Sequence, residues 1–326
     1  MRDNYNWNGI LLGNGASRAV WEKFKYSSLY ETALSADLDD PLTAEDQRLF
    51  EELDTTNFER VLDALATSRT VCDALGLDAT LIRERYKSIQ GALFEAVAKV
   101  HPPWRDEDVG VYHAVRLALS KYNFVFSTNY DLITYWAVMA GAGSGFKDFF
   151  FSEELEFDLA DTEIWGGRVT KVLYLHGGIH LAKARLSGAT VKRRATMDLN
   201  LLTSLDAMTD ENYIPLVVTE GKAREKLDSI HRSDYLSFAY QQLAQQTGPF
   251  VVFGSSLGDQ DQHLVNAMRR WRDARIAVSI YPTAAPQDII AIKANLHKRL
   301  PESNLLFFDS TTHPLGSTTL RISEQE

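Results

Sequence analysis

Short apolar runs recur along the chain, and each run ends in small or polar residues before a stretch with helical spacing. The runs are Gly9–Leu12, Phe124–Phe126, Val172–Leu175, Leu216–Val218, Phe250–Phe253, Ile276–Ile280 and Leu305–Phe308. Apolar and polar positions do not alternate within them, which is typical of strands covered on both faces of a parallel sheet. Strands that alternate with helices predict an α/β fold that is doubly wound around a mainly parallel, Rossmann-like sheet.

Two segments interrupt this alternation. Residues 21–122 show helical patterns and no convincing strand. Residues 181–212 are polar and carry the basic run 192–194, a composition that indicates a solvated loop. We therefore predict one α/β domain over residues 1–326, with a helical insertion or small lobe at 21–122 and a polar loop or insertion at 181–212.

Charge and cysteine content exclude several classes of protein. The chain has 326 residues, and its 44 acidic and 34 basic side chains give a net charge of −10, which argues against a nucleic-acid binder that works by neutralising phosphates. No apolar run approaches the roughly 18 residues of a membrane span, and the N-terminus lacks the layout of a signal peptide. The single cysteine, Cys72, excludes an internal disulfide and a cysteine-rich zinc site. Together these features predict a cytoplasmic protein.

Candidate chemistry lies where the predicted strands end, because ligands of open α/β sheets bind beyond the carboxyl ends of the strands. The first strand is followed by Gly13-Asn14-Gly15-Ala16-Ser17. Glycines there allow the backbone to approach a phosphate, and the next helix would offer free N–H groups. A tight turn from strand to helix is the alternative explanation of the same residues.

The second and third strands also end in polar residues. Thr128, Asn129 and Asp131 follow the second strand, where they could bind a ligand or cap the next helix. His176 ends the third strand and precedes two glycines, a position suited to acid–base chemistry near neutral pH, although a lone histidine is often structural.

A further polar strand end is Gly254-Ser255-Ser256, which opens a helix. Asp259 and Asp261 follow it, and acidic residues at this point also suit the dipole of a helix. The remaining histidines, His263 among them, show no metal-ligand spacing with cysteine or carboxylates, so we predict no metal site.

These motifs, in this order, resemble the sirtuin family of NAD-binding proteins. The resemblance rests on G-N-G-A-S at residue 13, T-N-Y-D at residue 128, L-H-G at residue 175 and G-S-S-x-x-D at residue 254. It spans Gly13 to Asp261 and is similar to a bacterial branch of the family. Tyr130, inside the second motif, replaces an aliphatic residue of the family pattern.

The resemblance implies a role for each motif. The loop that starts at Gly13 would line the pyrophosphate and the nearer ribose. Asn129 would hold a water or a ribose hydroxyl, Asp131 would bind the nicotinamide carboxamide, and His176 would accept or orient a hydroxyl proton. Further contacts to the cofactor are expected from Thr128, Gly254, Ser255, Ser256, Asp259 and Tyr281.

One departure from the family decides the expected reaction. Deacylating sirtuins carry a structural zinc on two pairs of cysteines, and this chain has one cysteine in all. The resemblance therefore implies an NAD+ hydrolase in which water accepts the ADP-ribose, used to deplete NAD in bacterial antiphage defence under the control of a protein partner or of homo-oligomeric assembly. A sensor of NAD or ADP-ribose without catalysis is the alternative, and a protein deacylase or ADP-ribosyltransferase is a third reading.

Overall fold

A seven-stranded sheet forms the centre of the protein. The computed structural model describes residues 6–150, 155–158, 169–193, 201–202, 212–219, 223–271 and 273–323. The strands of the main sheet are β1 (Gly9–Leu12), β2 (Phe124–Ser127), β3 (Phe146–Lys147), β4 (Thr170–Tyr174), β8 (Phe250–Phe253), β9 (Arg275–Ile280) and β10 (Asn304–Asp309). They pair in parallel in the order β10-β9-β8-β1-β2-β4-β3.

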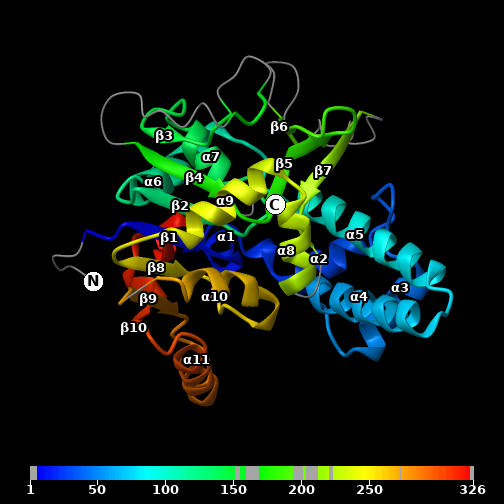
Figure 1. The fold of residues 1–326 in the computed structure, drawn as a ribbon. Coiled ribbons are helices and arrows are strands. Elements are labelled where there is room, and N and C mark those ends of the chain that lie inside the picture. Colours follow the sequence, from blue (N-terminus) through cyan, green and yellow to red (C-terminus); the bar gives the residue numbers. More distant parts are fainter. Residues whose placement is uncertain are drawn as a thin grey trace.

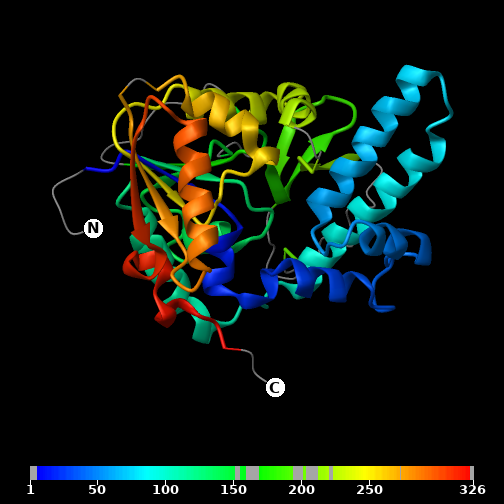
Figure 2. The ribbon, with the colours of Figure 1, turned by 90° about the horizontal axis from the view of Figure 1, so that it is seen from below.

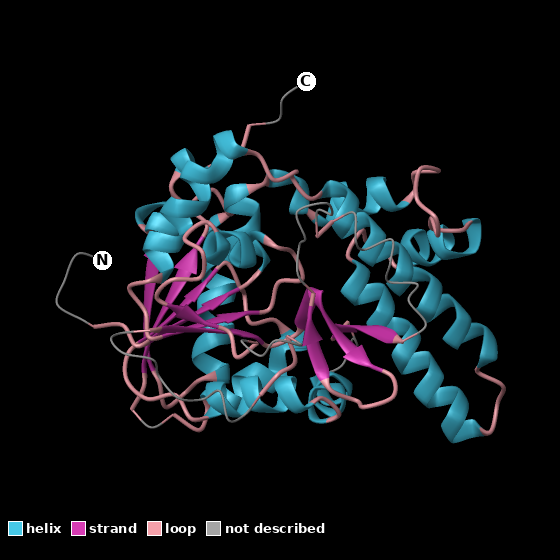
Figure 3. Ribbon diagram, turned by 90° about the horizontal axis from the view of Figure 1, so that it is seen from above, coloured by secondary structure: helices cyan, strands magenta, loops and turns pink. Residues whose placement is uncertain are grey.

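The chain winds outward from β1 in both directions, which confirms the predicted doubly wound α/β class. The helices are α1 (Asn14–Val20), α2 (Tyr26–Ala33), α3 (Ala44–Glu52), α4 (Phe58–Leu75), α5 (Thr80–Val100), α6 (Val109–Leu119), α7 (Ile133–Met139), α8 (Ala223–His231), α9 (Asp234–Ala244), α10 (Gln262–Met268) and α11 (Pro286–Arg299). Helices cover both faces of the main sheet (Figure 3). All four residues of β1 are buried, as the absence of alternation in this run requires.

The segment between β1 and β2 is helical in every described regular element. Helices α3, α4 and α5 extend to one side of the main sheet (Figures 1 and 2). Asn57 fixes the start of α4 because its side chain accepts a hydrogen bond from the backbone N–H of Glu59 at 2.9 Å. The buried residues Phe58, Val61, Leu62 and Leu65 then anchor α4 in the core.

A second, antiparallel sheet corrects two predictions. It contains β5 (Gly177–Ala184), β6 (Thr190–Lys192) and β7 (Tyr213–Val217) in the order β6-β5-β7. The run Leu216–Val218 therefore belongs to this sheet and not to the main one, because an apolar run does not specify its partner strand. Parts of β5 and β6 lie within 181–212, where a polar loop was predicted, while residues 194–200 and 203–211 lie outside the described residues.

No described helix is both long enough and apolar enough to pass through a membrane.

Candidate functional site

A cavity opens between the main sheet and the helical segment. From the sheet side it is lined by Gly13, Asn14, Thr128, Asn129, Tyr130, Asp131, His176, Gly254, Ser255, Ser256, Gln260 and Asp261. From the helical segment it is lined by Phe24, Tyr26, Leu29, Phe58, Glu59, Leu93 and Val97. The residues on the sheet side follow β1, β2, β4 and β8, so the cavity lies at the carboxyl edge where the strand order reverses.

Two glycine loops interlock at one wall of this cavity. Gly15 donates its backbone N–H to the carbonyl of Gly254 over 2.9 Å. Gly254 has a φ of +71°, and a Cβ on it would lie 2.4 Å from the backbone nitrogen of Ala16. A Cβ on Gly13 would lie 2.6 Å from Cβ of Ser255. Glycine is therefore required at this crossing both for backbone conformation and for the close approach of the chains.

The contact between these two loops keeps part of the motif that starts at Gly13 out of the lining of the cavity. The N–H groups of Gly15 and Ala16 bond to the carbonyls of Gly254 and Gly13, at 2.9 and 2.8 Å. These two amides are therefore used inside the protein, and their contact with a pyrophosphate remains a prediction. Ser17 is 2% exposed and also does not line the cavity.

Two other predicted cofactor contacts lie away from the cavity. The Asp259 side chain is fully exposed, with Arg299 Nη1 at 3.6 Å, and borders a neighbouring depression. Tyr281 is 60% exposed. Asp259 comes after β8 and Tyr281 directly after β9, and both side chains are exposed to solvent. Their contact with a cofactor therefore remains a prediction.

Asn129 and Asp131 are held together by Ser17. Asn129 Nδ2 donates to Ser17 Oγ at 2.8 Å and to the carbonyl of Gly13 at 3.0 Å. The Ser17 hydroxyl and the backbone N–H of Ile133 both stabilise the Asp131 carboxylate, but burial outweighs them and raises the pKa of Asp131. Ile133 is the first residue of α7 and Leu132 is its N-cap, so Asp131 lies one residue before the cap position and accepts the first N–H of the helix.

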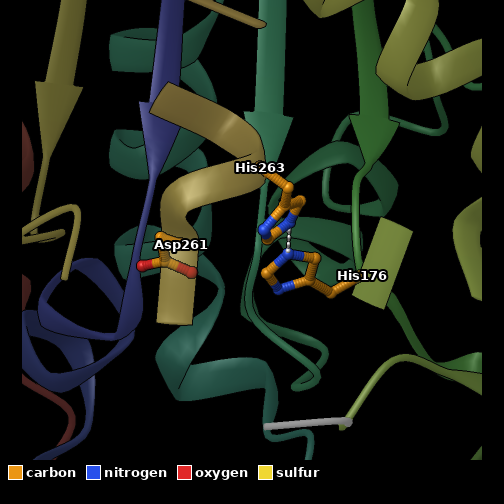
Figure 4. Close-up of side chains that lie close together, drawn as sticks. All are labelled: His176, Asp261 and His263. Carbon is orange, nitrogen blue, oxygen red and sulfur yellow. Dashed lines mark hydrogen bonds between the residues drawn. The ribbon is translucent and has the colours of Figure 1, made fainter. Parts of the chain in front are cut away.

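His176 meets a second histidine that the sequence did not assign to the site. His176 Nε2 lies 2.8 Å from Nε2 of His263, the second residue of α10 (Figure 4). Burial holds the pKa of His176 well below its usual range, and the charge of Lys226 adds to this effect. Burial likewise lowers the pKa of His263 to about 3. Both imidazoles are therefore neutral near pH 7, so one Nε2 donates and the other accepts.

Two charged side chains accompany the histidine pair. Burial raises the pKa of Asp261 to about 6, against the opposing effect of Lys226. Lys226 is completely buried in α8, and its ammonium lies 3.7 Å from Glu59 Oε2. Among the described residues Lys226 Nζ has no hydrogen-bond partner, so its charge acts on the site through space.

The cluster does not fit a metal ion well. Ligand atoms of His176, Asp261 and His263 all lie within 4.8 Å of one another, near enough for one ion. An ion would have to replace the direct hydrogen bond between the two imidazoles, and it would lie in the field of the buried Lys226 ammonium. We therefore assign no metal to these residues.

Sequence reasoning missed Asp261, His263, Lys226 and Glu59 as members of this cluster. Asp261 was explained by the helix dipole, and His263 by its lack of metal-ligand spacing. The available signal was that both follow the Gly254 loop, which already carried a candidate site.

The family of the chain is shown by one comparison. The family model described as "Domain of unknown function (DUF4917)" matches residues 10–315. The chain belongs to the DUF4917 family. No curated protein matches this DUF4917 chain. Among solved structures it is similar to a chain described as "Sir2-p53 peptide-NAD+", with 12% sequence identity, a TM-score of 0.34, and coverage of 95% of this chain and 91% of that one. A similarity of this size carries no argument about function.

Proposed function

We propose that this protein is an NAD+ glycohydrolase, which converts NAD+ and water into ADP-ribose and nicotinamide. The observation that carries the proposal is that Asn129, Asp131 and His176 meet in one cavity, beside two interlocked glycine loops. The motif resemblance to sirtuins supplies NAD+ as the substrate.

The residue types fit this reaction. Cleavage breaks the bond between C1′ of the ribose and the nicotinamide nitrogen, so the leaving group becomes neutral while positive charge builds on the ribose. Asp131 would hold the carboxamide of the leaving group. The oxygen of water then bonds to C1′, and His176, being neutral, would take the proton that this step releases.

Asn129 has a defined part in this scheme. Both hydrogens of its amide already have acceptors, namely Gly13 O and Ser17 Oγ. The group left to meet a ligand is therefore the acceptor Oδ1. An acceptor directs the hydrogen of a water toward itself and the oxygen lone pair toward the substrate, so Asn129 would orient the nucleophile.

Water is favoured over acyl-lysine as the acceptor of ADP-ribose. The zinc module that shapes the acyl-lysine cleft of deacylating sirtuins needs two cysteine pairs, and Cys72, in α4, is the one cysteine of this chain. We extend the proposal to a role in bacterial antiphage defence, in which a partner protein or homo-oligomeric assembly switches on the depletion of NAD. This extension rests on the motif resemblance to the zinc-less sirtuin branch.

A sensor of NAD or ADP-ribose is the second candidate. It is favoured by the helical segment, which supplies a whole wall of the cavity through η1 (Glu22–Phe24), α2, α4 and α5. A bound ligand would contact these helices, and a change in their position would signal binding without a chemical reaction.

Release of nicotinamide tests the two candidates. Purified protein is incubated with NAD+ at several protein concentrations, and nicotinamide, ADP-ribose and bound NAD+ are measured over time. We expect equal amounts of both products and a loss of at least about 100-fold in Asn129→Ala and in His176→Ala. The control Asn266→Ala should change little, because Asn266 is exposed and its side chain accepts a hydrogen bond from Gln262 within α10. Tight binding of NAD+ without product at any concentration would establish the sensor instead.

A further inference from the structure

The pairing of His176 with His263 joins two distant parts of the chain. His176 follows β4, and His263 lies 87 residues later at the start of α10. Both side chains are almost completely buried, at 2% and 1% exposure. His176 lines the cavity and His263 does not, so His263 stands directly behind the proposed base (Figure 4).

The hydrogen bond decides which nitrogen of His176 is left for a ligand. Because Nε2 is engaged by His263, the remaining ring nitrogen is Nδ1. Nδ1 can accept a proton only if the hydrogen of the neutral ring sits on Nε2, which requires His176 to donate and His263 to accept.

The geometry of the pair defines what His263 must do in this arrangement. The buried Nδ1 of His263 has no hydrogen-bond partner among the described residues. A neutral His263 that keeps its hydrogen on Nδ1 has a bare Nε2, and that bare nitrogen is the acceptor that His176 needs.

Charged groups from four other elements lie near the pair: Lys226 acts on both histidines, while Glu59 and Arg299 act on Asp261 beside them. Asp261 comes from η5 (Asp259–Asp261), Lys226 from α8, Glu59 from α4 and Arg299 from α11. The carboxylate of Asp261 would offset the positive charge that appears on His176 when it takes a proton, and Lys226 favours the ionised form of Asp261.

We propose that His263 is a positioning residue for the reaction, which accepts the Nε2 hydrogen of His176 and thereby presents Nδ1 of His176 to the substrate as the proton acceptor. The inference rests on the proposed NAD+ cleavage. In the reaction, a hydroxyl of the ribose or of the attacking water loses its proton to Nδ1, while His176 keeps the hydrogen on Nε2 and remains bonded to His263. The proton leaves Nδ1 for solvent when the product departs, so the enzyme returns to its starting state.

Variants of His263 separate positioning from packing. His263→Ala removes the acceptor, and we expect kcat to fall about 100-fold with KM changed less than about threefold. His263→Gln restores an acceptor oxygen at similar reach, and we expect kcat to recover to within about tenfold of the wild type. The control is His313→Gln, because His313 is a buried histidine whose Nε2 bonds to Tyr122, outside the cavity. It should leave kcat within about twofold.

Several outcomes would overturn the inference. They are full activity of His263→Ala, equal losses in the Ala and Gln variants, or a loss that appears entirely in KM. Activation by added Zn²⁺ would also contradict it, because the ion would have to displace the hydrogen bond between the two rings.

Nitrogen NMR of the histidine side chains tests the geometry without any activity. In ¹⁵N-histidine-labelled protein, we expect hydrogen on Nε2 and a bare Nδ1 for His176, identified by comparison with His176→Gln. In His263→Ala this preference should be lost. If the wild type does not cleave NAD+ but shows this tautomer, the proposed function fails while the pairing stands. Hydrogen on Nδ1 of His176 would overturn the inference, whatever the activity.

Discussion

Ser17 Oγ accepts a hydrogen bond from Asn129 Nδ2 over 2.8 Å, and the same hydroxyl stabilises the carboxylate of Asp131 by hydrogen bonding. A hydroxyl has a single hydrogen, so when Asn129 donates to the oxygen, the serine hydrogen is available for the carboxylate. The first turn of α1 thus fixes two side chains of the loop between β2 and α7. Ser17 does not line the cavity, but it orients two residues that do.

Removing this hydroxyl should damage the site and the fold together. In Ser17→Ala, Asn129 loses an acceptor and Asp131 a donor, and both are buried. We expect a loss of about 1–3 kcal/mol in the free energy of unfolding and at least a tenfold loss of NAD+ cleavage. Ser17→Thr keeps the hydroxyl and should retain more activity than the alanine variant. Denaturant unfolding and nicotinamide release measure the two effects, and equal behaviour of both variants in the two assays would argue against the role of the hydroxyl.

A pair of glycine variants tests whether the interlocked loops shape the cavity. Gly254 and Gly76 both have positive φ, at +71° and +69°, but a Cβ on Gly76 would have nothing within 4 Å. Gly76→Ala should therefore cost only the backbone strain, about 1 kcal/mol, and leave NAD+ binding unchanged. Gly254→Ala adds a clash with Ala16 and should weaken binding at least tenfold. Isothermal calorimetry compares the two, and similar affinities would contradict the proposed wall.

The sequence predicted the main sheet well because its central strands β1, β2 and β8 are buried on both faces. That requirement leaves a local signature, a short apolar run without alternation, and the run at Gly9–Leu12 corresponds to β1 with the same bounds. The carboxyl-edge position of the candidate residues then followed from the general geometry of parallel sheets. The two residues of β3 are too few to leave such a signature.

The second sheet and the histidine pair could not be predicted in this way. Gly177 has a φ of +73°, and a Cβ on it would lie 1.9 Å from the Leu216 carbonyl, so it is a close crossing of β5 and β7 that needs this glycine. Its partner lies 39 residues away, and nothing local marks it. The same holds for His176, Lys226 and His263, which meet only because β4, α8 and α10 pack around one point.

Acid should destabilise the protein through its buried histidines, and His180 provides a test. Burial lowers the pKa of His180 to about 3, so the folded protein keeps the ring neutral while the unfolded chain takes up a proton below about pH 6.5. The unfolding free energy is therefore lost as the pH falls through this window, by about 1.4 kcal/mol per pH unit for one histidine. His180 has no hydrogen-bond partner among the described residues. Between pH 7 and pH 5, the unfolding free energy of His180→Phe should thus fall by about 2 kcal/mol less than that of the wild type. The same substitution at the exposed His113 should change this pH dependence little.

Asp261 should show the opposite dependence on pH. Its pKa is raised to about 6 in the folded state, so the folded protein holds this proton more tightly than the unfolded chain does. The contribution of Asp261 to stability is therefore present below about pH 4 and is lost as the pH rises through 6. Asp261→Asn cannot ionise. As the pH rises from 4 to 7, we therefore expect its unfolding free energy, measured in urea, to increase by roughly 1–3 kcal/mol relative to that of the wild type. It should also slow NAD+ cleavage, because no carboxylate then offsets the charge on protonated His176.

Asp259→Asn is the matched control, since that side chain is fully exposed two residues earlier. A gain in stability that does not change with pH, or an equal gain in the control, would show that the pH dependence of stability does not come from the raised pKa of Asp261.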